Sequence, residues 1–138
     1  MEDVNKAAVT RWMEVAWNQR RAEVIDELLT ADSVCHADDG DLVGPDQFRD
    51  RQYGPFLAAF PDLRIQIEEM VAQGDAVVTR WVATGTHSQE GMGFKATAEP
   101  ATFRGVTWVR LKDGKFVEGW QHSNIPEVVR GLASRAPA

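Results

Sequence analysis

Cysteine is almost absent from this chain, and its scarcity narrows the kinds of site that the chain can hold. The 138 residues include a single cysteine, Cys35. An intramolecular disulfide framework and a cysteine-rich zinc site are therefore both excluded, and we expect Cys35 to be a small buried residue. Long apolar runs are missing as well, because none approaches the roughly 20 residues that a membrane-spanning helix requires. The sequence predicts no membrane association.

Positive charge is also scarce. The chain has 15 Lys and Arg residues against 21 Asp and Glu, which gives a net charge of −6. Nucleic-acid binding draws on clustered basic residues, so we expect no nucleic-acid partner. Residues 1–6 show no basic region followed by an apolar stretch, and the sequence therefore predicts no export signal and a cytoplasmic location.

What the chain does contain is typical of one globular domain. Its hydrophobic fraction is 43% and its charged fraction 26%, a balance that favours a packed core over disorder. A chain of this length buries roughly two thirds of its unfolded surface. We expect a single domain over residues 1–138 with room for a pocket in its core.

The apolar pattern changes along the chain from a helical period to alternation. Helices are predicted over residues 5–18 and 45–60, with a shorter helix around residues 24–29 and a strand over 32–36 between them. Alternation then predicts strands over 63–71, 76–87, 102–111 and 115–124, with a bulge near Glu69, a two-residue hairpin at Asp113-Gly114, a helix near Pro126 and a frayed end at 136–138. This order predicts an α+β fold whose N-terminal helices pack on a strongly bent, mostly antiparallel sheet, a cone with a pocket at its open end.

The last predicted strand carries four side chains that alternate along it: Glu118, Trp120, His122 and Asn124. Alternate residues of a strand leave the same face. If the Asp113-Gly114 turn pairs the strands without interruption, Val109 faces Glu118, Thr107 faces Trp120 and Gly105 faces His122. We therefore expect these residues, with Phe116, to line a cavity. The alternative is that Glu118 and His122 lie at the exposed ends of an ordinary sheet.

Three histidines, His36, His87 and His122, are candidate catalytic residues. Imidazole exchanges protons near neutral pH, so a general acid–base role fits any of them. His122 is the first choice because Trp120 and Asn124 flank it. Each could instead be a core histidine bound to a backbone carbonyl. A three-histidine zinc site is less favoured because no two of them have the close spacing of a helix-borne site.

Aromatic residues supply the candidate substrate contacts. Trp81 and Trp120 would form the apolar wall of a pocket for a large, flat or macrocyclic substrate, although plain core packing explains them equally well. Tyr53 is the only tyrosine, and its hydroxyl either reaches the cavity mouth or lies at the surface. Glu118 either fixes a histidine tautomer or is a carboxylate at the edge of the cone.

Several short motifs occur in an order that resembles one family: Phe60-Pro61-Asp62-Leu63, Gly74-Asp75, Arg80-Trp81, Gly85-Thr86-His87, Asp113-Gly114-Lys115 and Glu118-Gly119-Trp120. Together they resemble the SnoaL-like polyketide cyclase and ester cyclase family over nearly the whole chain. The resemblance implies a cone-shaped barrel of the nuclear transport factor 2 type, a homodimer, a small-molecule substrate, and no metal or cofactor. Well-known members close a ring by an intramolecular aldol step with an Asp as general acid and base.

At one position the chain departs from that family. The carboxylate of the family usually follows the Trp of the Glu-x-Trp motif by four residues, and Asn124 stands there. A carboxamide can orient a substrate but cannot take up a proton at working pH. We therefore expect a cofactor-free cyclase or isomerase that acts on a polyketide or another secondary-metabolite intermediate, mainly by holding its conformation with histidine assistance. The alternatives are a non-catalytic binding or dimerisation module and a hydrolase- or hydroxylase-type relative.

Overall fold

Helices dominate the first sixty residues and strands most of the rest. A computed structural model describes residues 1–137. Its helical elements are α1 (Glu2–Arg11), η1 (Trp12–Asn18), α2 (Glu23–Leu28), α3 (Gly44–Phe48), η2 (Arg49–Tyr53), α4 (Gly54–Ala59) and α5 (Ile125–Ser134), where η1 and η2 are π-helical. Its strands are β1 (Leu29–Ala37), β2 (Gly40–Val43), β3 (Arg64–Gln73), β4 (Ala76–Thr86), β5 (Pro100–Lys112) and β6 (Lys115–Ser123).

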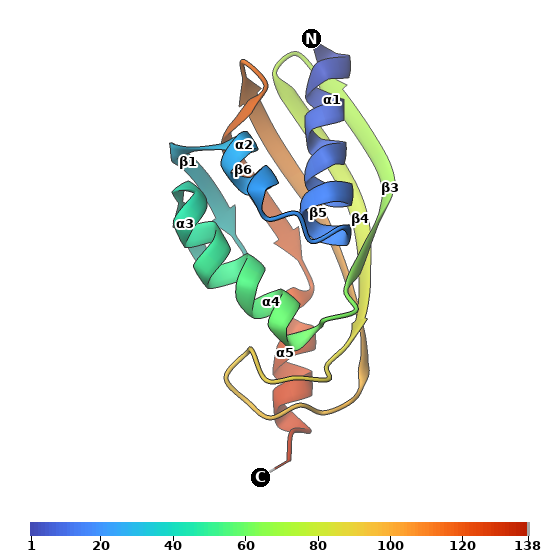
Figure 1. Ribbon diagram of the computed structural model, residues 1–138. Helices are drawn as coiled ribbons and strands as arrows, with labels where there is room; N and C mark the ends of the chain where they lie inside the picture. Colours follow the sequence, from blue (N-terminus) through green and yellow to red (C-terminus); the bar gives the residue numbers. More distant parts are fainter. Residues whose placement is uncertain (138) are drawn as a thin grey trace.

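The six strands form one mixed sheet in the order β2-β1-β6-β5-β4-β3. All neighbouring strands are antiparallel except β1 and β6, which are parallel. The sheet keeps two edges, at β2 and β3, so it is not a closed barrel. The predicted α+β class is confirmed, with helices covering one face of the sheet (Figure 1).

The helices enclose a core between themselves and this inner face of the sheet. α1 and η1 pack against β3, and the segment from α3 through α4 crosses the sheet as one continuous helical rod (Figure 1). Their buried side chains meet those of the strands: Trp12 contacts Phe48 and Phe116, and Phe56 contacts Phe60 and Phe103. The aromatic residues of the rod therefore cover the inner face of the sheet.

Most predicted elements occur where the pattern placed them. The ladder between β3 and β4 shifts between Ile67 and Glu69, which confirms the bulge. Asp113 and Gly114 both have positive φ angles, 53° and 77°, as a two-residue hairpin turn of type I′ requires. Lys112 pairs with Lys115 across it.

The region around β1 differs from the prediction. β1 begins at Leu29 and forms a hairpin with β2, in which Ala37 pairs with Gly40. The sequence indicated only a turn there, because four residues are too few for alternation to be visible. Among residues 1–137, no helix is both long and apolar enough to cross a membrane. The predicted frayed end includes Ala138, which lies outside the described residues.

Candidate functional site

The register between β5 and β6 decides which side chains face the helices. Leu111 pairs with Phe116, as the hairpin predicts, but the ladder then shifts between Arg110 and Leu111. Beyond this bulge the pairs are Val109 with Gly119, Thr107 with Gln121 and Gly105 with Ser123. The predicted partners are therefore wrong by one residue. A one-residue slip moves every side chain beyond it to the other face of the strand.

The consequence is a correction to the predicted site. Glu118, Trp120 and His122 share a face, but their cross-strand partners are Arg110, Trp108 and Val106. Trp108 and Val106 are 46% and 38% exposed, so this is the outer face of the sheet. His122 is exposed and does not line the cavity, contrary to its placement as the first catalytic choice.

On the outer face, His36 joins three strands. Its Nε2 lies 2.6 Å from Glu118 Oε2 and its Nδ1 lies 2.7 Å from Asp41 Oδ1. Its ring stacks on Trp120 at 5.5 Å between centroids, because the parallel pairing of β1 and β6 sets these two residues side by side. The hydrogen bond to Glu118, and then the one to Asp41, raise the pKa of His36. Of the two roles considered for Glu118, the contact with a histidine is the one present.

The cavity lies between the helices and the inner face of the sheet. It measures about 90 Å³, which is small beside the roughly 300–1,000 Å³ of typical ligand sites. Its walls are mainly apolar, and their aromatic residues include Trp12, Trp17, Phe56, Trp81, Phe103 and Phe116. Trp81 and Phe116 thus lie where a substrate-binding role needs them. Trp120 and Glu118 also border the cavity, although their side chains engage His36.

Most polar groups of the cavity wall are already bonded within the protein. The Ser33 hydroxyl donates to the carbonyl of Phe116 at 2.6 Å, and the Thr107 hydroxyl accepts from the Trp81 indole at 2.9 Å. Gln121 donates from its amide to Asp38 at 3.1 Å. These bonds leave little unsatisfied polarity facing an apolar ligand.

The carboxylate of Asp38 accepts a hydrogen bond from one of these wall residues, Gln121, although Asp38 itself does not line the cavity. Its Oδ1 accepts from the backbone N–H of Ser123 at 2.9 Å, and its Oδ2 accepts from the Ser123 hydroxyl at 2.5 Å and from Gln121. Three donors therefore fix its orientation at the end of β1, beside a residue that lines the cavity. Asp38 is half-buried. A carboxylate so placed can take up and return a proton.

Cys35 lies on the inner side of β1, opposite Leu42 and Gly119. Burial, then the negative charges of Asp41 and Asp38, raise the pKa of its thiol to about 11. This environment favours the neutral thiol over the reactive thiolate. Cys35 is half-buried, less completely than the sequence predicts.

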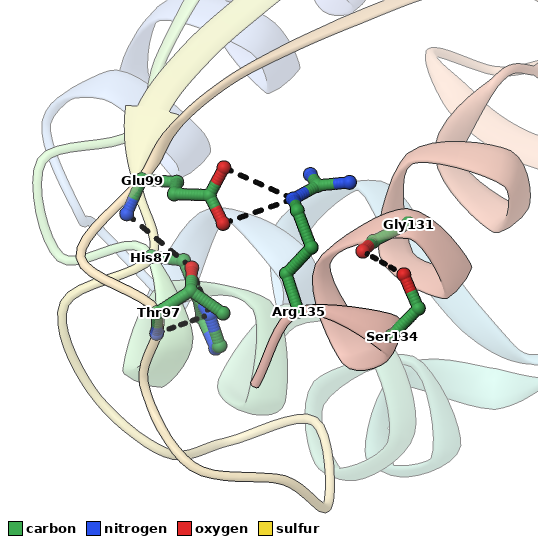
Figure 2. Close-up of polar contacts among 6 residues, drawn as sticks. All are labelled: His87, Thr97, Glu99, Gly131, Ser134 and Arg135. Carbon is green, nitrogen blue, oxygen red and sulfur yellow. Dashed lines mark hydrogen bonds and ion pairs between the residues drawn. The ribbon is translucent and has the colours of Figure 1, made fainter. Parts of the chain in front are cut away.

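His87 lies away from the cavity wall, beneath the loop that joins β4 to β5 (Figure 2). It is fully buried, and its ring contacts Phe60 and Phe94. Its Nδ1 accepts from the backbone N–H of Thr97 at 3.1 Å. Because an amide can only donate, the neutral ring carries its proton on Nε2, which has no partner among the described residues. Burial lowers the pKa of His87.

The same loop is held to the C-terminal helix. Glu99 receives the Nε–H of Arg135 at 3.0 Å, and Ser134 donates back to the carbonyl of Gly131 within α5 (Figure 2). His87 therefore packs beneath a loop that is ion-paired to the end of α5. Its predicted position in the pocket is wrong, because β4 ends at Thr86 and His87 does not line the cavity.

Two further candidates have structural contacts. Tyr53 is buried and donates from its hydroxyl to the carbonyl of Ala16 at 2.7 Å, so it lies neither at the mouth nor at the surface. Asn124 accepts the backbone N–H of Arg104 through its Oδ1 at 2.8 Å. This bond extends the β5–β6 pairing beyond the last strand residue. Among residues 1–137, no three His, Cys, Asp or Glu side chains gather closely enough to hold a metal ion.

Sequence reasoning missed the polar residues on the inner face of β6 and the carboxylate bonded to them. Gln121 and Ser123 occupy the strand positions between those chosen, and Asp38, which binds both, was assigned only to a turn. Gln52, from η2, also lines the cavity and was not singled out. The single signal that could have indicated Gln121 and Ser123 is a second, bulged register of the hairpin, in which they replace Trp120 and His122 on the inner face.

The arrangement of helices on one face of the bent mixed sheet is that of the ketosteroid isomerase-like fold. A solved protein from Catenulispora acidiphila that carries this fold name superposes with a TM-score of 0.73 at 18% identity, over 92% of each chain. The model of the SnoaL-like polyketide cyclase family matches residues 7–132. This chain belongs to that family.

Solved structures agree with the assignment. A proposed SnoaL-like polyketide cyclase from Jannaschia sp. CCS1 has a TM-score of 0.87 at 22% identity, over 99% of this chain and 95% of that one. IdmH, a proposed polyketide cyclase from Streptomyces antibioticus, is 29% identical, with a TM-score of 0.78 over 93% and 97%. AclR, a proposed hydroxylase from Streptomyces galilaeus, is 30% identical, with a TM-score of 0.78 over 94% and 82%. No curated protein sequence gave a match.

Proposed function

We propose that this protein is a cofactor-free cyclase or isomerase that acts on a polyketide or related secondary-metabolite intermediate. Membership of the family supports a small-molecule substrate. The observation that carries the proposal is the Asp38 carboxylate, which is held by Ser123 and by Gln121, a residue of the largely apolar cavity wall. Asp38 lies in the turn between β1 and β2, so this proton-transfer group comes from outside β6, the strand on which it was expected.

The proposed reaction begins at an acidic C–H group of the substrate that lies next to the Asp38 carboxylate. Asp38 removes a proton from a methylene group between two carbonyls of the substrate. The resulting enolate attacks a ketone or aldehyde carbon of the same molecule and forms a C–C bond. The new alkoxide then takes the proton back from the Asp38 carboxylic acid. The product is an isomer of the substrate, and no oxidant or reductant is consumed.

The cavity walls make a second contribution to catalysis, because they fix the conformation of the substrate. Aromatic side chains on both sides of the cavity hold the chain in a folded conformation, and such orientation can lower a barrier by several kcal/mol, up to ~7–11 in well-oriented cases. Because the cavity measures about 90 Å³, only the reacting segment of a polycyclic or macrocyclic substrate fits within these walls. The rest of such a substrate extends from the mouth or displaces a wall.

Hydroxylation is a second candidate function, favoured by the 30% identity to AclR. The two functions give products of different mass. Purified protein is incubated with anthraquinone and linear β-keto esters that carry an unclosed side chain, and the products are separated by liquid chromatography and weighed. Ring closure gives an isomer of unchanged mass, or its dehydrated form, whereas hydroxylation, which consumes O₂ and two electrons from a reductant added to the incubation, adds one oxygen atom.

A binding module without catalytic activity gives a third pattern, in which ligands bind and no product forms. Exchange in D₂O separates the cases further, since a functioning Asp38 base introduces deuterium at the acidic carbon of the substrate even when closure is slow. Absence of both exchange and product across the panel would remove the enzyme proposal. A polyketide synthase gene beside this one would support the enzyme, and an adjacent kinase or transport gene the module.

We further propose that the protein forms a homodimer through the outer face of the sheet. Trp108 is 46% exposed there, with Trp120 at 6.2 Å between ring centroids and the Arg110 guanidinium over its ring at 6.0 Å. Exposed aromatic surface of this kind is typical of interfaces. Light scattering at micromolar concentration should give twice the monomer mass for the wild type and the monomer mass for Trp108→Glu. A monomeric wild type would reject the proposal.

A further inference from the structure

Among the amide and hydroxyl side chains of the cavity wall, one has no hydrogen bond to the rest of the described protein. Gln52 lines the cavity and is half-buried, and its carboxamide has no hydrogen-bond partner among the described residues. The other amide and hydroxyl groups of the wall, on Ser33, Thr107 and Gln121, are each bonded to a neighbour. Both the N–H donors and the carbonyl oxygen of Gln52 are therefore free for a ligand.

The local structure explains why this residue faces inward. Gln52 belongs to the π-helical segment η2, whose other polar residues turn outward. Arg49 binds Asp26 and Asp46 at the surface. Asp50 and Arg51 are both exposed, and neither lines the cavity. The next residue, Tyr53, is fixed by its bond to Ala16 in η1. Wide π-helical turns occur frequently at functional sites.

Filling the cavity changes the environment of this carboxamide. In the empty cavity water can satisfy it, but an apolar ligand would displace that water and leave donor and acceptor unpaired, which is unfavourable. A ligand with a carbonyl or hydroxyl group on the inserted segment replaces the lost hydrogen bonds. The Gln52 amide thus penalises hydrocarbon ligands and favours oxygenated ones.

We infer that Gln52 is a specificity-determining residue that binds a carbonyl or hydroxyl oxygen on the segment of the substrate that enters the cavity. The inference deepens the proposed function and rests on it for the identity of the substrate. As a positioning residue, Gln52 would set which carbonyl of a poly-ketone chain lies near Asp38.

The test uses two probes of nearly equal shape, acetophenone and ethylbenzene, which differ by a C=O in place of a CH₂. Binding is followed by NMR through the indole N–H signals of the cavity tryptophans. The variants are Gln52→Leu and, as a matched control, Gln66→Leu on the exposed side of β3. Wild type and control should bind acetophenone more tightly than ethylbenzene, by about 2- to 12-fold for one neutral hydrogen bond. Gln52→Leu should lose this preference and bind ethylbenzene at least as tightly as wild type.

Three results would overturn the inference: a ketone preference that persists in Gln52→Leu, an equal loss of both probes, or no binding of either probe to wild type at millimolar concentration. The proposed function fails separately. If no substrate of the panel is exchanged or converted while the ketone preference still depends on Gln52, the cavity is a binding site and the cyclase is rejected. If substrates are converted and Gln52→Leu leaves their KM and product distribution unchanged, the role of Gln52 alone is rejected.

Discussion

Replacing Gly105 with Ala should test how tightly the sheet fits beneath Trp81. Gly105 pairs with Trp81 across β4 and β5, and a Cβ at this position would lie 2.5 Å from Cζ2 of Trp81 and 2.8 Å from Cβ of Ser123. Neither neighbour is the end of a flexible side chain. Overpacking of this kind costs about 1–3 kcal/mol, and we expect the upper part of that range.

An alanine in a strand also recovers about 0.5–1 kcal/mol relative to glycine. The net loss in the free energy of unfolding should therefore be about 2 kcal/mol. At roughly 3–5 °C per kcal/mol for a chain of this size, the Tm should fall by roughly 6–10 °C. Urea unfolding followed by tryptophan fluorescence gives the free energy directly.

Gly119 provides a matched control in the same sheet. A Cβ there would lie 3.5 Å from the carbonyl oxygen of Trp108 and 3.8 Å from Cγ2 of Val109, which are ordinary contacts. Gly119→Ala should therefore leave stability unchanged or raise it by up to about 1 kcal/mol. Equal destabilisation by both variants, or wild-type stability of Gly105→Ala, would refute the packing described for Trp81.

Two further predictions concern stability. Asn18 brackets Ile65 by accepting its N–H at 2.7 Å and donating to its carbonyl at 2.8 Å, so Asn18→Ala should lower the free energy of unfolding by about 1–3 kcal/mol, and an unchanged urea midpoint would contradict this. His36 and His87 should give opposite pH dependence. Because the pKa of His36 is raised, its contribution to the free energy of unfolding is complete below about pH 6.5 and is lost as pH rises through the folded-state pKa. Because the pKa of His87 is lowered, its contribution is complete above about pH 6.5 and is lost as pH falls through the folded-state pKa. Unfolding of wild type and His36→Gln from pH 5 to 9 should show a difference that shrinks on the alkaline side, and NMR should find His87 still neutral at pH 6.5; a pH-independent difference or an early-titrating His87 would refute the assignments.

The fold was largely predictable from the sequence because its signals are local. Apolar spacing indicated the helices, alternation the long strands, and Asp113-Gly114 the hairpin turn. The strand β2 was not predictable because four residues are too few to show alternation. The parallel pairing of β1 with β6 was not predictable because it joins segments that lie more than eighty residues apart in the chain. Trp81 and Phe116 were correctly placed at the cavity because Trp81 keeps its predicted place in the alternation of β4 and Phe116 precedes the register shift of β6.

The rest of the site could not be predicted, for one physical reason. Strand alternation carries information about faces only as far as the register is continuous. A single extra residue after Phe116 turned Trp120 and His122 outward and brought Gln121 and Ser123 inward. Asp38 joins them from β1 only through tertiary pairing, so no local pattern connects it with β6.

The most direct test of the proposed site compares Asp38→Asn with His122→Gln on the first substrate that the panel identifies. Asp38→Asn retains the shape of the side chain and removes the proton acceptor, and kcat should fall by about 10²–10⁴-fold, the usual range for loss of a general acid–base group. His122→Gln changes an exposed residue of the outer face, and kcat should stay within about twofold of wild type because the substrate does not reach it. Unchanged turnover in Asp38→Asn would contradict the site described above.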